Sequence, residues 1–367
     1  MPFGFGLLNE VWKGPHGPNV LLSPTSLCFG LAMTANGANH ETYSQIVETL
    51  QLDSYALDDI NEALRALRSS LSTPGEGVQL DIANALWVQQ GLELKADFLA
   101  RNTKSYRAEV QSLDLHSPGA ADHINQWVSQ ATHQHIRDIV REPIERDASL
   151  FLTDAVYFKA PWEFKFDTRG TADGTFTTAD GTQRAVKMMT QKGQFKHFAG
   201  GDAEAIALPF VGDRFEFLVF LPSAQSSLAA FLTTLSPANW AQWMKDLKQT
   251  EVTIRLPRFA IESGLTLNDA LTALGMGLPF TQHADFGSLL ATPVKGPTFL
   301  KEVRHQTFLE VDEEGAEAAA ATSHKMLTKS ASPAIEVNRP FFCAIRDRRS
   351  GVLLFVGAIG DPTAAAL

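Results

Sequence analysis

Residues 150–158 read LFLTDAVYF, an almost unbroken apolar run with Asp154 near its centre. A continuous apolar run of this length is typical of a strand that is buried on both faces of its sheet. Such a strand needs a large core around it, and 44% of the 367 residues are hydrophobic. The run therefore predicts a strand in the interior of a large sheet.

Helical patterns dominate the chain before this run, and strand patterns dominate after it. Buried or amphipathic helices are predicted at residues 26–36, 42–52, 57–71, 96–106 and 124–139. Strands are predicted at 78–88, 205–221 (two strands joined at 211–214), 251–259, 336–345 and 352–359, with a helix at 265–274. Helices and strands do not alternate regularly, and no repeat or linker is visible. The sequence therefore predicts an α+β fold, with one large domain over 1–367 and largely antiparallel or mixed sheets.

Composition and charge argue against several classes of function. The net charge of −10 argues against a nucleic-acid partner. No apolar run is long enough to cross a bilayer, so we expect no membrane partner. Residues 1–18 lack the pattern of a signal peptide, as would a mature chain after processing. Cys28 and Cys343 lie in apolar runs and are predicted to be buried free thiols, which leaves the cellular compartment open.

Signatures of catalysis and of cofactor binding are missing from the sequence. It contains no Gly-x-Ser-x-Gly elbow, no His-Glu-x-x-His motif and no Walker loop. His133 and His135 are two residues apart on the predicted helix 124–139, so we expect them to point to different faces. Together with His123 they are interpreted as solvated surface residues. We therefore expect no enzyme activity, no cofactor and no metal.

One stretch fits neither the helical nor the strand pattern. Residues 315–333 read GAEAAAATSHKMLTKSASP and have no large apolar stripe. A segment this long without core contacts is uncommon in a compact domain and is usually functional or disordered. From these residues alone, an alanine-rich surface helix is an equally good interpretation, because Ala is the best helix former.

Separated blocks of sequence carry a resemblance to a known family. They include 19–27 (NVLLSPTSL), 83–88 (ANALWV), 106–109 (YRAE), 124–128 (INQWV), 156–162 (VYFKAPW), 186–189 (VKMM), 256–259 (LPRF), 337–342 (VNRPFF) and 355–357 (FVG). In this order they resemble the serpins, the serine protease inhibitors, over almost the whole chain. The resemblance implies about three β-sheets, eight or nine helices and an exposed reactive loop at 315–340.

The resemblance also implies where the large sheet opens. Ser23, Asp154 and His305 match the polar residues of the family's shutter, the place where two strands part. The family usually has Asn at the position of Asp154, and an Asp–His pair would hydrogen-bond with a strength that depends on pH. Arg65 and Arg68 are two isolated charges, so no basic activator site is evident.

In the family, the cleaved reactive loop inserts into the large sheet as a new strand. Counting forward from the glycine at the hinge, and back from residues 338–340, places the cleaved bond between Lys329 and Ser330. Alternate residues of an inserted strand face the core, and small side chains enter between touching strands at low steric cost. The predicted hinge comprises Gly315, Ala316, Glu317, Ala318, Ala319, Ala320 and Ala321.

These features predict an inhibitor that traps a serine protease covalently. A lysine before the cleaved bond suits the acidic specificity pocket of a trypsin-like protease. One alternative is cleavage after Leu327 or Met326 by a chymotrypsin-like enzyme, and another is a serpin that acts as a carrier or chaperone without inhibiting. We expect a monomer that carries the family's risk of polymerisation.

Overall fold

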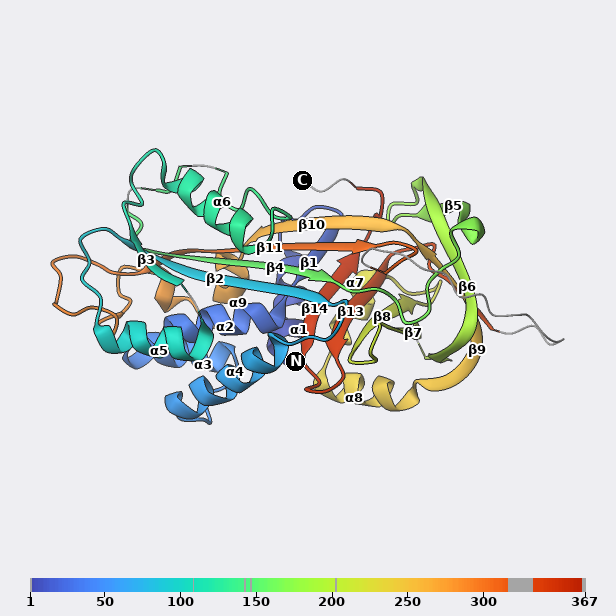
Figure 1. The fold of residues 1–367 in the computed structure, drawn as a ribbon, viewed down its shortest axis with the longest axis horizontal. Helices are drawn as coiled ribbons and strands as arrows, with labels where there is room; N and C mark the ends of the chain where they lie inside the picture. Colours follow the sequence, from blue (N-terminus) through green and yellow to red (C-terminus); the bar gives the residue numbers. More distant parts are fainter. Residues whose placement is uncertain are drawn as a thin grey trace.

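In the computed structural model the chain folds into two β-sheets and a group of helices (Figure 1). The structure describes residues 2–107, 109–141, 143–145, 147–201, 203–315 and 333–364. Within these residues the α+β fold class predicted from the sequence is confirmed.

The five-stranded sheet has the order β10-β11-β4-β2-β3. Its strands are β10 (Phe259–Thr266), β11 (Leu300–Val311), β4 (Leu150–Lys159), β2 (Gln79–Gln89) and β3 (Glu109–Leu113). β4 lies in the middle, parallel to β11 and antiparallel to β2. Its residues 150–158 are all buried, so the prediction that this run forms an interior strand is confirmed.

The two faces of this sheet are covered by different parts of the chain. α2 (Pro24–Ala35) packs against β2 and β4 on one face, and α6 (Ala120–Ala131) lies over the opposite face (Figure 1). The side chains of β4 alternate accordingly. Those of Val156 and Phe158 belong to the main core, whereas those of Phe151 and Ala155 belong to a smaller core under α6.

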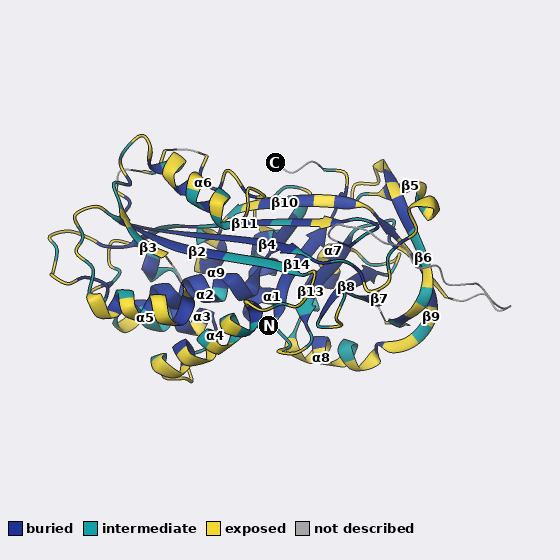
Figure 2. Cartoon of the chain, viewed as in Figure 1, coloured by how far each residue is buried: buried dark blue, intermediate teal, exposed yellow. Residues whose placement is uncertain are grey.

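The nine-stranded sheet has the order β1-β14-β13-β8-β7-β6-β9-β12, with β5 paired to β6. Its strands are β1 (Asn19–Leu22), β14 (Leu353–Ile359), β13 (Phe341–Asp347), β8 (Phe215–Pro222), β7 (Ala203–Pro209), β6 (Gln183–Gly200), β9 (Lys248–Pro257), β12 (Ala334–Glu336) and β5 (Ala172–Thr177). The strands at its centre are almost wholly buried (Figure 2). The long β6 pairs first with β5 and last with β7, and so it joins two parts of the sheet. We expected about three sheets, and because β6 joins two of them, the strands form two hydrogen-bonded sheets.

Nine α-helices occur in the described part of the chain. Besides α2 and α6 they are α1 (Pro2–Lys13), α3 (His40–Thr49), α4 (Leu57–Leu71), α5 (Ala96–Tyr106), α7 (Leu228–Thr233), α8 (Pro237–Asp246) and α9 (Asn268–Ala273). α4 and α5 have the predicted bounds. α2 begins where Ser23 Oγ accepts the backbone N–H of Ser26 and Pro24 occupies the first turn.

The helix predicted at residues 124–139 is wrong at both ends. α6 begins at Ala120 and ends at Ala131, and His133 and Gln134 then take φ values of 50° and 67°. This left-handed backbone cannot continue an α-helix. His133 and His135 therefore follow the helix, and the argument that placed them on different helix faces does not apply. The ring of His135 stacks on that of Tyr157 at a centroid distance of 3.8 Å, so His135 is more than a solvated surface residue.

Both cysteines are free, as predicted, with Cys343 buried and Cys28 half-buried. Burial raises the pKa of the Cys28 thiol to about 12. No described helix is long and apolar enough to cross a membrane. Among the described residues, no three His, Cys, Asp or Glu side chains are placed to hold a metal ion.

Candidate functional site at the β4–β11 seam

The contact between β4 and β11, here called the β4–β11 seam, is parallel and incomplete. Pairing runs from Leu300 beside Leu150 to Phe308 beside Tyr157. Beyond this point β4 runs on to Lys159 and β11 to Val311, but the two strands are not paired there in the described residues. The next contact of this kind is an isolated antiparallel bridge between Pro161, after β4, and Gly315, after β11. The seam is thus paired along most of its length and unpaired between the Phe308–Tyr157 position and the Gly315–Pro161 bridge.

A buried Asp–His pair crosses the seam. His305 and Asp154 lie side by side in the strand register, and both side chains are fully buried. His305 Nε2 accepts the backbone N–H of Ser23 at 2.9 Å, so the imidazole proton is on Nδ1. His305 Nδ1 then donates to Asp154 Oδ1 at 3.0 Å. The structure therefore brings together the three residues predicted as the shutter.

Two further buried side chains complete the cluster, and sequence reasoning missed both. Ser26 Oγ lies 2.9 and 2.8 Å from the carboxylate oxygens of Asp154. Asn84, beside Asp154 in the register of β2 and β4, donates from Nδ2 to Asp154 Oδ2 at 2.8 Å. The carboxylate therefore accepts from three side chains. An acceptor-only group suits this position, which explains in local terms why Asp can stand where the family usually has Asn.

Arg68 is linked to the buried Asp154 carboxylate through the side chain of Asn84. Arg68 donates to Asn84 Oδ1 at 3.2 Å and to the Ile82 carbonyl at 3.0 Å. Burial lowers the pKa of Arg68 to about 10, so the side chain stays charged at neutral pH. Arg65, by contrast, pairs with Glu62 at the surface. Arg68 therefore lies on the inward side of α4, and the expectation that these early helices carry no basic activator site stays a prediction.

The predicted hinge begins at a position that only glycine can occupy. Gly315 has φ of 112°, and a Cβ there would lie 2.4 Å from both the Ala160 carbonyl oxygen and the Trp162 nitrogen. The same neighbours hold the chain in place, because Trp162 donates its backbone N–H to the Glu314 carbonyl at 3.0 Å. The chain therefore leaves β11 from a fixed point.

Side chains from the segment after β4 anchor the acidic residues before the hinge. Trp162 Nε1 donates to the Asp312 carbonyl at 2.9 Å, and Lys165 pairs with Glu314 at 2.6 Å. Burial, together with the charges of Glu313 and Glu314, raises the pKa of Asp312. Asp312 Oδ1 in turn accepts the backbone N–H of Glu314.

The rest of the predicted loop falls mainly outside the described residues. Ala316 to Ala321, Lys329 and Ser330 all belong to residues 316–332. The described chain resumes at Pro333, and β12 then pairs in parallel with β9. Arg339 donates twice to the Pro222 carbonyl and so fixes the chain after β12.

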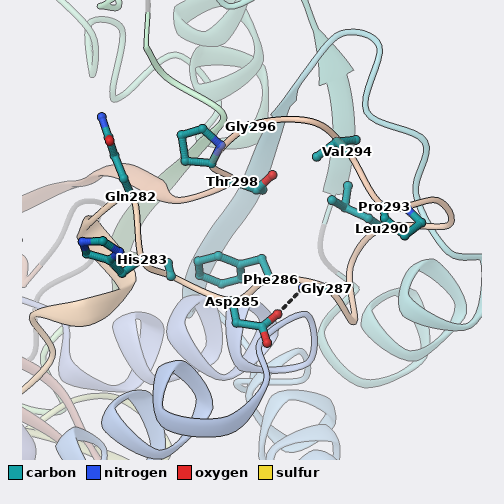
Figure 3. A pocket seen from close by; sticks show the side chains of 12 residues that line it. Gln282, His283, Asp285, Phe286, Gly287, Leu290, Pro293, Val294, Gly296 and Thr298 are labelled. Carbon is teal, nitrogen blue, oxygen red and sulfur yellow. Dashed lines mark hydrogen bonds between the residues drawn. The ribbon is translucent and has the colours of Figure 1, made fainter.

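A surface hollow of about 470 Å³ lies just before β11 begins, at the end of the seam opposite Gly315. Figure 3 shows the side chains that line it. Phe286, Leu290, Val294 and Thr298 contribute to its wall. Asp285 points away from it and accepts the Gly287 N–H. The groups that line this hollow do not form a catalytic arrangement, so the seam remains the candidate site.

Comparison with known proteins agrees with this geometry. Residues 1–362 match the family model "Serpin (serine protease inhibitor)". Chicken (Gallus gallus) neuroserpin is 32% identical over 371 residues, which cover 97% of this chain and 89% of that protein. The native state of tengpin, a thermophilic serpin, superposes with a TM-score of 0.90 at 28% identity, covering 98% of this chain and 92% of that one.

The same fold also occurs in a protein that binds a small molecule. A thyroxine-binding globulin in complex with thyroxine superposes with a TM-score of 0.89 at 26% identity, covering 99% of this chain and 98% of that one. The likeness over the whole chain therefore establishes the family, which is a family of protease inhibitors and not of enzymes but also includes the non-inhibitory thyroxine-binding globulin. This chain belongs to the serpin family.

Proposed function

We propose that this chain is an inhibitory serpin that traps a trypsin-like serine protease after cleavage between Lys329 and Ser330. The observation that carries the proposal is the antiparallel bridge between Gly315 and Pro161. If this register continues, each later loop residue lies beside one earlier residue of β4. Ala318 would then lie beside Phe158, and Ala320 beside Val156.

This register matches small loop residues to the main core. Phe158 and Val156 face that core, and residues directly opposite each other in an antiparallel pair share a face. Ala318 and Ala320 would therefore point inward, where a charged residue would be buried without a partner. Further along, Thr322 would lie beside Asp154 and bring a hydroxyl to the buried polar cluster.

The other set of loop residues would face the α6 side of the sheet. Glu317 would lie beside Lys159 at the open end, and Ala319 beside Tyr157. Small residues would therefore face the core on both sides of the sheet, and Glu317 would lie beside the basic Lys159. A carrier or chaperone gains nothing from this match, and so we favour inhibition over that alternative.

The protease supplies the catalytic chemistry of trapping, and the serpin supplies the bond that is cleaved. The protease serine attacks the Lys329 carbonyl and forms an acyl-enzyme, and the amine of Ser330 leaves with the rest of the chain. Insertion of about 14 residues at roughly 3.3 Å each would move the esterified protease about 46 Å. The serpin supplies the register and the space for this movement, and its distortion of the protease would prevent hydrolysis.

The proposal is tested by mixing the protein with trypsin and separating the products on a denaturing gel. We expect a stable band at the summed mass, with the cut mapped after Lys329. Ala318→Arg should give cleavage without this band, because a charge would enter the core. Glu317→Arg places the same residue on the opposite face and should still trap. Cleavage of the parent without a covalent band would contradict inhibition of this class of protease.

The choice of target is tested separately by Lys329→Leu. This change should move covalent trapping from trypsin to chymotrypsin by at least tenfold in the ratio of second-order rate constants, because trypsin's acidic pocket selects a basic side chain. An unchanged ratio would mean that the cleaved bond lies elsewhere, with Leu327 and Met326 as the alternatives.

A further inference from the structure

Three aromatic rings meet across the β4–β11 seam on the face that α6 covers. Tyr157 and Phe308 are neighbours in the strand register, and their ring centroids lie 6.1 Å apart at an interplanar angle of 22°. The ring of His135, from the segment after α6, stacks on Tyr157 at 3.8 Å and lies 6.4 Å from Phe308. His135 therefore contacts both strands of the seam.

This ring stack lies at the end of the paired part of the seam, where an inserting strand would enter. Tyr157 and Phe308 form the last paired position before the unpaired stretch that leads to Gly315. A strand entering from Gly315 would reach this pair first, before it reached the Asp154–His305 pair deeper in the sheet. We propose that His135 acts as a latch that sets the rate of loop insertion, an inference that rests on the proposed function for its biological role.

Insertion is incompatible with all three ring contacts at once. Neighbouring strands lie about 4.8 Å apart, so a new strand would separate β4 from β11 by about 9.6 Å. A ring that lies 3.8 Å from Tyr157 cannot then remain 6.4 Å from Phe308 in the same arrangement. At least one contact of the His135 ring breaks when the fourth residue after Gly315, Ala319, arrives beside Tyr157.

The latch is distinct from the buried polar cluster in both place and chemistry. His305 and Asp154 are fully buried on the main-core side, whereas His135 is exposed and Phe308 is half-buried. The small core under α6 includes Phe308 at its margin. The rings therefore hold the seam from outside, where one side chain can be changed without emptying the main core.

The test uses a synthetic peptide with the sequence of residues 316–329, added to the full chain at neutral pH. Its incorporation as an extra strand is followed by native gel electrophoresis. His135→Ala should speed incorporation about fivefold, which corresponds to ~1 kcal/mol at 1.4 kcal/mol per factor of ten. His135→Phe keeps a ring at this position and should restore a rate within about twofold of the parent.

His133→Ala is the matched control, because His133 lies in the same loop but pairs with Asp81 at 3.6 Å. It should leave the rate unchanged. Equal acceleration by His133→Ala, or a rate for His135→Ala within twofold of the parent, would overturn the latch. The peptide assay needs no protease, so the latch can stand or fall independently of covalent trapping by trypsin.

Discussion

Different kinds of contact hold neighbouring strands together within the two sheets of this serpin. At the centre of the nine-stranded sheet, the ring of Phe220 lies within 6.4 Å of the rings of Phe198, Phe231, Trp240, Trp243 and Phe342. The β4–β11 seam is crossed mainly by the hydrogen bonds of Asp154 and His305, with the single cross-strand ring pair of Tyr157 and Phe308 at the last paired position. Separating packed rings forfeits their contacts outright, whereas an incoming strand can replace hydrogen bonds. The difference indicates which sheet stays closed and which one opens.

The largest effect on stability is expected in the sheet that stays closed. Phe220→Ala should lower the apparent free energy of unfolding of the native form by about 4 kcal/mol, because it leaves a cavity among packed rings. Urea unfolding followed by circular dichroism measures this change. The folded fraction should still form the covalent complex with trypsin. Loss of trapping in protein that remains folded would break the contrast between the two sheets.

A somewhat smaller loss of stability is expected at the seam, but with a second consequence. Asp154→Ala leaves Ser26, Asn84 and His305 without their shared acceptor and should cost about 3 kcal/mol. It should also speed incorporation of the 316–329 peptide, since the seam loses its crossing hydrogen bonds. Asp154→Asn retains one acceptor oxygen and should lose less than half as much. Peptide incorporation as slow in Asp154→Ala as in the parent would contradict the role of this cluster.

The smallest effect is expected just before the hinge, where burial raises the pKa of Asp312. The folded chain binds this proton more tightly than the unfolded chain, so stability rises as the pH falls through the raised folded pKa toward the ordinary value. Asp312→Asn should therefore be more stable than the parent by ~0.3 kcal/mol at pH 7, allowing for solvent screening, with the gain fading in acid. Thermal midpoints from pH 3 to 8 test this. A gain that grows toward low pH would have the wrong sign.

The sequence predicted the interior of the fold better than its margins. The run at residues 150–158 fixed β4, and the amphipathic period of α4 and α5 fixed their bounds. β5 and β6 were missed because only one of the six residues of β5 and five of the 18 residues of β6 are buried, which leaves a weak apolar signal. The end of α6 was missed because nothing in its composition shows that His133 and Gln134 take left-handed backbone.

The site was predictable only in part, because it depends on contacts between distant segments. Ser23, Asp154 and His305 came from the resemblance to the family, and the structure brings them together. Asn84 could have been suspected as a polar residue within an apolar strand. Arg68 could not, since its inward direction depends on how α4 packs against the rest of the chain.

The claim that the seam accepts the loop is tested most directly by cutting that loop with a metalloprotease. Such an enzyme forms no acyl-enzyme with the loop and therefore leaves the cleaved serpin free. We expect the thermal midpoint to rise by roughly 10 °C or more after a single cut within residues 316–332, since 1 kcal/mol moves the midpoint of a large domain by about 2 °C. An unchanged or lower midpoint would show that no strand was added, and it would contradict insertion at the β4–β11 seam.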